Sequence, residues 1–123
     1  MKIRVYYEDT DAGGIVYHTR YINFCERARS ETFFERGMIP SQNKQSGFVV
    51  RNINAGFLAT SKLGDLLTVT SKILTRKNSS LLLLQEIWRD EIKVFSMEVV
   101  LVYIDKDRPR RIPPEFIEIF DTL

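Results

Sequence analysis

The sequence predicts an α+β fold in which one antiparallel sheet curls around a single helix. One long segment has the helical period, four later segments have the composition of strands, and the connections between those strands are too short for crossover helices. The chain of 123 residues lies in the size range of one domain and is long enough to bury a hydrophobic core. We therefore expect residues 1–123 to form a single domain.

The first two elements predicted are a strand and the long helix. Residues 3–7 are β-branched and aromatic, which is typical of a strand, and the polar segment 8–14 ends it. Apolar residues then recur at spacings of three and four from Tyr21 to Thr32. Thr19 is a suitable N-cap for this helix and Gly37 a suitable stop. Further aromatic residues lie outside the apolar stripe, so the helix needs cover on more than one side.

The second half of the chain predicts strands. A loop is expected over 38–47, followed by strands over 48–57, 67–73, 81–88 and 94–103. Turns are expected at 63–65, 76–79 and 89–91, and a charged turn over 105–111. Residues 113–120 begin with two prolines and predict a short last helix.

Composition excludes several classes of protein. The net charge is +2 with both signs mixed along the chain, which permits an anionic ligand without requiring nucleic acid. The strand aromatics are better explained as core residues than as a nucleic-acid surface. Apolar runs fall far short of the roughly 18 residues of a membrane span, and the N-terminus lacks the apolar core of a secretory signal. We therefore expect no membrane span and a cytoplasmic location.

The chain has one cysteine and one histidine, Cys25 and His18. An internal disulfide is impossible, and the spacing of a zinc site is absent, so no metal is expected. A reactive Cys–His pair is also unfavourable, because seven residues along a helix separate the two by about 10.5 Å. Cys25 is expected in the core. Chemistry that needs an imidazole must use His18 or borrow a group from a second subunit.

The segment Glu8–Gly14 holds the densest polar cluster. Its glycines permit positive φ and close approach of a ligand, and its carboxylates lie beside the expected helix start, where free amides can hold an oxyanion. This arrangement suits attack on a carbonyl, with Asp11 as nucleophile or base and amides near His18 polarising the oxygen. Composition alone favours a plainer alternative, a helix-entry loop whose aspartates only cap the helix. Asp9 and Asp11 also resemble the paired aspartates of magnesium-dependent phosphatases, but those enzymes need a βαβ fold.

Residues 5–31, VYYEDTDAGGIVYHTRYINFCERARSE, resemble the signature of bacterial acyl-CoA thioesterases of the 4-hydroxybenzoyl-CoA thioesterase family. The similarity is strongest to the subgroup encoded beside the Tol-Pal envelope system. The Leu63–Leu66 turn and the run of four strands also fit, so the resemblance covers nearly the whole chain. It implies the hot-dog fold, a curved antiparallel sheet wrapped around one long central helix. It further implies dimers, often paired into tetramers, with active sites built across the dimer junction.

The resemblance also implies roles for individual residues. Asp11 occupies the place of the catalytic aspartate, and the backbone amide of His18 that of the amide that polarises the carbonyl. The His18 side chain matches a histidine characteristic of the subgroup and is expected in the site. Gly14 belongs to the expected substrate-binding loop. Tyr7 lies where the subgroup keeps an aromatic residue that borders the acyl pocket, although a buried strand tyrosine is another interpretation.

Coenzyme A carries phosphates, which cations at the mouth of a cleft would bind. The Arg76–Ser80 turn resembles the turn that meets the nucleotide in related enzymes, with Lys77 and Ser80 matching best. A solvated hairpin turn is an equal alternative, and a solvated turn is the preferred interpretation of the second basic cluster, Arg108, Arg110 and Arg111.

The sequence thus predicts an enzyme that hydrolyses acyl-CoA to free acid and coenzyme A without a metal or another cofactor. Its expected partners are the substrate, a second copy of the chain in a homodimer or homotetramer, and acyl carrier protein as an alternative carrier. A non-catalytic protein of the same fold, which binds acyl-CoA or acyl carrier protein as a scaffold, is the alternative function.

Overall fold

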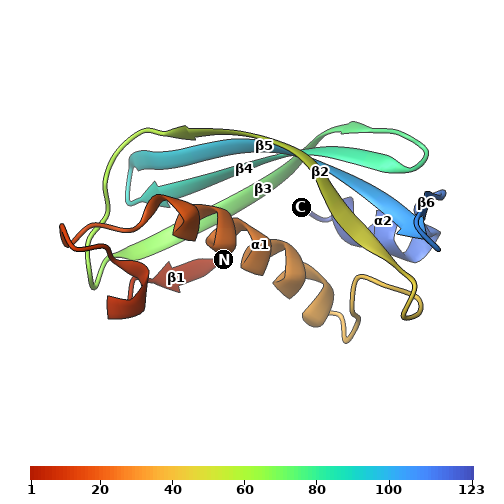
Figure 1. The fold of residues 1–123 in the computed structure, drawn as a ribbon, viewed down its shortest axis with the longest axis horizontal. Coiled ribbons are helices and arrows are strands. Elements are labelled where there is room, and N and C mark those ends of the chain that lie inside the picture. The colour runs from red at the N-terminus through yellow and green to blue at the C-terminus, as the bar shows by residue number, and fades with distance from the viewer.

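The sheet curves over one long face of helix α1 (His18–Phe34), and a shorter helix, α2 (Pro114–Phe120), lies near one end of the sheet (Figure 1). The structure is a computed structural model that describes all of residues 1–123. A short 3-10 turn, η1 (Tyr7–Asp9), precedes α1. Neither helix combines the length with the apolar character that crossing a membrane would take.

Six strands form the sheet, and every pairing is antiparallel. The strands are β1 (Lys2–Arg4), β2 (Ser46–Phe57), β3 (Leu66–Arg76), β4 (Ser80–Arg89), β5 (Ile92–Asp105) and β6 (Arg108–Pro109). Their order is β1-β3-β4-β5-β2, with β6 paired to the end of β5. The four long strands and the last short helix were all predicted from the sequence, and an antiparallel α+β fold is confirmed.

The order of the strands in the sheet differs from their order along the chain. β3, β4 and β5 are joined by short turns and pair as neighbours, but β2 pairs with β5 and not with β3. Residues 58–65 therefore cross from one edge of the sheet to the other side of β4. Three strand spacings amount to about 14 Å, which eight extended residues span easily at about 3.3 Å each. A connection of this length does not by itself decide which strands pair.

The core lies between α1 and the concave face of the sheet. Leu81, Leu83 and Ile87 of β4 are buried there, whereas the alternate residues Leu82 and Leu84 are half-buried on the opposite face. The helix contributes mainly Tyr21, Phe24, Cys25, Ala28 and Phe33. The predicted burial of Cys25 is confirmed, and burial raises the pKa of its thiol to about 12.

The two ends of α1 differ in how well the sequence predicts them. At the C-terminal end Gly37 has φ +69, and the amides of Gly37 and Met38 donate to the carbonyls of Phe34 and Phe33. This Schellman arrangement confirms Gly37 as the stop. The N-cap is Tyr17 rather than Thr19, and no side chain caps the helix. Thr19 as N-cap is therefore wrong.

The N-terminal strand is shorter than expected. It ends at Arg4, and Tyr7 belongs to η1 with 83% of its surface exposed. A strand through residue 7 and a buried strand tyrosine are both wrong. The Val5 amide donates to Asp65 O and the Val5 carbonyl accepts from the Gly64 amide, so the chain is held by the crossover segment here and then turns away from β3.

The edge strand β2 has a partner on one side only. It hydrogen-bonds to β5, its other edge faces solvent, and residues 49–54 are all exposed. A β-bulge between Val50 and Asn52 interrupts its register with β5. A free edge of twelve residues is a surface on which another strand can pair.

Candidate active site

Residues 10–16 form a small hairpin that presents Asp11 beside the start of α1. Thr10 and Val16 pair across its base, and the Asp11 amide donates to the Ile15 carbonyl at 2.9 Å. The Gly14 amide closes the turn on the Asp11 carbonyl, with Gly14 at φ +81. The predicted use of a glycine at positive φ is thus confirmed.

The Asp11 side chain is held within this hairpin. Its Oδ1 accepts a hydrogen bond from the Gly13 amide at 2.8 Å. A Cβ atom at Gly13 would lie 3.2 Å from the same oxygen, closer than most real contacts. Glycine at this position therefore lets the backbone approach the carboxylate, which stays exposed to solvent.

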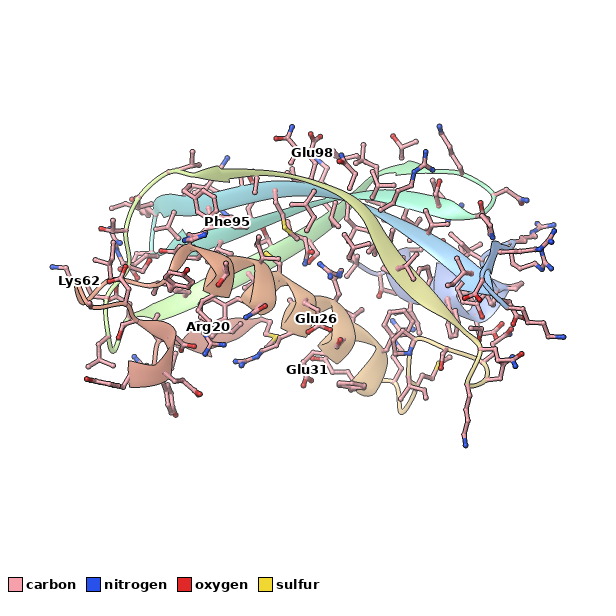
Figure 2. The ribbon with its side chains drawn as sticks, in the orientation of Figure 1. Arg20, Glu26, Glu31, Lys62, Phe95 and Glu98 are labelled. Atoms are coloured by element: carbon pink, nitrogen blue, oxygen red, sulfur yellow. The ribbon has the colours of Figure 1, made fainter.

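Asp9 fixes the base of the hairpin through buried contacts. Its side chain is almost fully buried, and Oδ2 accepts from the Tyr6 amide at 2.8 Å. Its Oδ1 has no hydrogen bond but lies 3.6 Å from Nε of Arg20, whose Nη2 donates to the Glu8 carbonyl. The Asp9 carbonyl accepts the Tyr17 amide at 2.9 Å. Asp9 and Arg20 therefore join the hairpin base to the first turn of α1, from which Arg20 projects (Figure 2).

The crossover segment supports the other leg of the hairpin. The Val16 amide donates to the Ser61 carbonyl at 2.8 Å, and Ile15 bridges to Lys62. Ser61 is fully buried beside Tyr21. Burial raises the pKa of the Tyr21 phenol, an effect that the neighbouring Ser61 hydroxyl partly offsets. The segment that crosses the sheet thus also fixes the loop that carries Asp11.

The start of α1 leaves backbone donors free. The Tyr17 amide is bonded to Asp9 and the Arg20 amide to Tyr17, but the amides of His18 and Thr19 donate to no acceptor in the chain. Such amides, at the positive end of the helix dipole, can bind an oxyanion. Neither aspartate caps α1, so the interpretation of the loop as a plain helix cap is wrong.

The His18 side chain points toward the end of β2. Its ring centroid lies 4.6 Å from that of Tyr17 and 5.9 Å from that of Phe57, the last residue of β2. His18 and Asp11 are both exposed, and neither of them lines any of the five main cavities of the single chain. Tyr7 is likewise exposed and lines none of these cavities, and its role in substrate binding stays a prediction.

Lys77 and Ser80 line one groove of about 570 Å³ beside β2. Arg51 and Asn52 of β2 also line it, so two cations face the same groove. Ser80 of β4 pairs with Val102 of β5, whereas Phe57 at the end of β2 pairs with Phe95, seven residues earlier on β5. The groove and His18 are therefore separated by about 20 Å along the sheet. The chain brings Asp11, Gly14 and His18 together at one end and Lys77 with Ser80 at another place.

The sequence argues against a metal site and against the paired aspartates of a phosphatase. No three His, Cys, Asp or Glu side chains gather as metal ligands would. The antiparallel sheet rules out the βαβ fold of magnesium-dependent phosphatases. The sequence alone did not predict that Asp9 joins the hairpin to α1, because its pairing with Arg20, 11 residues away, exists only in the folded chain. It also did not select Arg51, because the groove that Arg51 shares with Lys77 is formed by separate strands.

Comparison with known proteins assigns the family. Residues 13–96 match the family described as the thioesterase superfamily. The acyl-CoA thioesterase YbgC of Helicobacter pylori is 36% identical, with both chains covered completely, and that of Haemophilus influenzae is 36% identical over 98% of this chain and 93% of its own. A probable thioesterase from Bartonella henselae has the same fold, with TM-score 0.82, 33% identity, and coverage of 92% of this chain and 95% of its own. The chain belongs to the thioesterase superfamily and is an enzyme of that family with the hot-dog fold.

Proposed function

We propose that the protein hydrolyses acyl-CoA to the free acid and coenzyme A. The observation that carries the proposal is the Asp11 hairpin, which fixes a carboxylate in the loop that leads directly into a helix start with two free amides. The curated relatives named above as acyl-CoA thioesterases support the same substrate class.

The proposed reaction uses Asp11 and the amide of His18. The Asp11 carboxylate attacks the thioester carbonyl carbon, or removes a proton from the water that does so. The carbonyl oxygen gains negative charge, and the free amides of His18 and Thr19 stabilise it. The carbon–sulfur bond then breaks, and the thiolate leaves and takes a proton to become the thiol of coenzyme A. If water is the nucleophile, the acid is released directly and the proton held by Asp11 is the one that the thiolate takes. If Asp11 is the nucleophile, water then hydrolyses the mixed anhydride, which releases the free acid and restores the carboxylate. No step in this scheme requires a metal or a further cofactor.

We further propose that the remaining predicted residues bind substrate. Gly14 keeps the hairpin open to the thioester, the His18 ring and Tyr7 border the acyl group, and Lys77 with Ser80 holds the nucleotide. Arg51 is added to this set, because it faces the same groove as Lys77 and a nucleotide carries several phosphates.

The proposed functional unit is a dimer joined through β2, and two dimers can pair into a tetramer. A single chain leaves Asp11 and His18 exposed and leaves one edge of a twelve-residue strand unpaired. Pairing of two β2 edges would continue the sheet across a two-fold axis.

We also propose that residues 1–123 form one domain, with α1 as the central helix of the hot-dog fold. A cytoplasmic location and membership of the Tol-Pal-associated subgroup complete the proposal.

Substitution of Asp11 tests the function. Asp11→Asn should fold normally and lose at least about 100-fold in kcat toward acyl-CoA, because the amide is neither nucleophile nor base. Glu8→Gln is the matched control, since Glu8 is an exposed acid three residues away. Full activity of Asp11→Asn would remove Asp11 from the mechanism.

A substrate panel tests the carrier and the scaffold alternative. Short, long and aromatic acyl groups are supplied on coenzyme A and, in parallel, on acyl carrier protein, and thiol release is followed. An enzyme releases thiol catalytically from at least one of them. A scaffold would bind acyl-CoA without releasing thiol from any member of the panel, and that result would contradict the proposed function.

A further inference from the structure

A cavity of about 190 Å³ lies between the second half of α1 and the start of β2. Its apolar walls come from α1, β2, β5 and α2, namely Phe33, Phe48, Val50, Leu101 and Phe120. Three polar side chains of α1 also line it: Glu26, Arg29 and Ser30. Figure 2 labels Glu26 on this part of the helix. The cavity is far too small for a nucleotide and suits a short acyl chain.

Arg29 brings a positive charge to this cavity and forms no ion pair, although Glu26 lines the same cavity and lies close enough for its charge to act on the guanidinium. Its Nη1 donates to Oε1 of Gln85 at 2.8 Å, and Gln85 is fully buried, with Nε2 donating to the Cys25 carbonyl and to Ser71. No carboxylate lies within ion-pair distance of Arg29, and Glu26 instead accepts a hydrogen bond from Ser30. The core amide thus fixes the guanidinium, and its other N–H groups remain free for a ligand.

A half-buried cation held by a neutral group favours an anionic ligand. Removing the charge from water is costly unless an anion compensates it, and a carboxylate matches the geometry of a guanidinium. The apolar walls would take methylene groups at the same time. The ligand chemistry that fits both features is a short aliphatic chain that ends in a carboxylate.

The position of the cavity relates it to the catalytic residues of a second copy. Within one chain Arg29 lies eleven residues, or about 16 Å, along α1 from His18. Phe48 and Val50, near the start of β2, line the cavity, whereas His18 contacts Phe57 at the end of β2. When two identical strands pair antiparallel about a two-fold axis, the start of one lies beside the end of the other. The cavity of one protomer then adjoins His18 of its partner.

We propose that this cavity binds the far end of the acyl group whose thioester is cleaved at Asp11 and His18 of the partner protomer, and that Arg29 binds a terminal carboxylate there. The inference rests on the proposed function and on its dimer. It names a substrate class, the coenzyme A thioesters of short dicarboxylic acids, and makes Arg29 the residue that selects this class.

Pairs of substrates that differ only in charge test the selection. Succinyl-CoA is compared with 4-methylpentanoyl-CoA, and glutaryl-CoA with 5-methylhexanoyl-CoA, because an isopropyl group has the shape of a carboxylate. In at least one pair the wild type should prefer the carboxylate by about tenfold or more in kcat/KM, as expected for a charged hydrogen bond. Arg29→Met should abolish that preference while keeping activity on the branched substrate, and Arg29→Lys should keep part of it.

Arg27→Met is the control, since Arg27 lies on the same helix but is exposed. It should behave as the wild type. Equal losses on both members of a pair in Arg29→Met, or no preference for a carboxylate in the wild type, would overturn the selection by Arg29. A wild type inactive on all four substrates and on the wider acyl panel would instead contradict the proposed function itself.

A heterodimer tests whether the site is shared. Asp11→Asn and Arg29→Met chains carrying different tags are co-expressed, and the mixed dimer is purified through both tags. If the site is shared, one of its two sites has both wild-type residues, so activity on the preferred carboxylate substrate should be about half that of the wild type. If each chain forms its own site, the mixed dimer has no intact site and shows only the residual activity of Arg29→Met, which would overturn the shared cavity. The branched substrate, which needs only Asp11, reports the number of competent chains.

Discussion

Replacing Asp9 by asparagine tests whether a buried carboxylate holds the Asp11 hairpin in place. Asparagine keeps the shape, and its oxygen can still accept the Tyr6 amide. The substitution removes the negative charge opposite Nε of Arg20. The NH2 group of the asparagine would then face the Arg20 guanidinium, and two hydrogen-bond donors cannot bond to each other. The hairpin with Asp11 and the first turn of α1 then lose one of the contacts that join them, while the hydrogen bonds to the carbonyls of Asp9 and Glu8 remain.

The expected cost follows from the burial of the two partners. The Asp9 side chain is 4% exposed and that of Arg20 29%, so the pair is neither fully buried nor at the surface. Breaking a fully buried pair costs about 3–5 kcal/mol, and an exposed pair contributes below about 1 kcal/mol. Arg20 keeps its bond to the Glu8 carbonyl and reaches water. We therefore expect a loss of about 1–3 kcal/mol in the free energy of unfolding.

Thermal unfolding and steady-state kinetics together check this prediction. A loss of that size should lower Tm by roughly 4–12 °C in a chain of this length. Because the loop carries Asp11, kcat should fall further than KM changes. Asp90→Asn is the control, since Asp90 is exposed in a turn at φ 53, which asparagine tolerates. Unchanged Tm and kcat in Asp9→Asn would refute the proposed anchoring.

Two pairs of substitutions and one thiol probe give three further tests. Gly14→Ala should lower the free energy of unfolding, measured in urea, by about 1 kcal/mol, because the positive φ of +81 is the only obstacle to a side chain there. Gly13→Ala should instead lower kcat, because its Cβ would displace the Asp11 carboxylate. Equal effects of the two substitutions on stability and on kcat would contradict this. Leu83→Ala should cost about 2–5 kcal/mol and Leu82→Ala, on the other face of β4, markedly less. Cys25 should not react with a thiol reagent at pH 8 until the protein unfolds, because its raised pKa of about 12 keeps the thiol protonated there; fast labelling of the native chain would contradict its burial.

Local patterns predicted the elements of this fold well and their arrangement less well. The period of α1 and the stop at Gly37 depend on contacts within a few residues, and both are confirmed. The pairing of β2 with β5 depends on a crossover whose direction no local pattern records. The sequence also placed Tyr7 in a strand because of its aromatic character, although the turn at η1 is imposed by the burial of Asp9.

The site divides in the same way. The two-glycine hairpin and the start of the helix form a short motif in the sequence, so Asp11, Gly14 and His18 could be chosen from it as candidates. Arg29 and Gln85 are 56 residues apart, and nothing in their neighbours marks them as partners. Only the folded sheet brings Gln85 under α1 and so leaves a fixed cation facing a cavity.

The exposure of Asp11 in a single chain is a reason to expect a second chain at the open edge of β2. In water the charges of a carboxylate and of helix amides are strongly screened, so they stabilise a transition state far less than in a dry site. One chain supplies these groups on an open surface, and its apolar cavity lies about 16 Å along the helix from His18. Pairing through β2 would place the cavity of each chain against the exposed hairpin of the other and would exclude water from both. The free edge, which in a monomer could pair with any exposed strand, would then complete two sites at once.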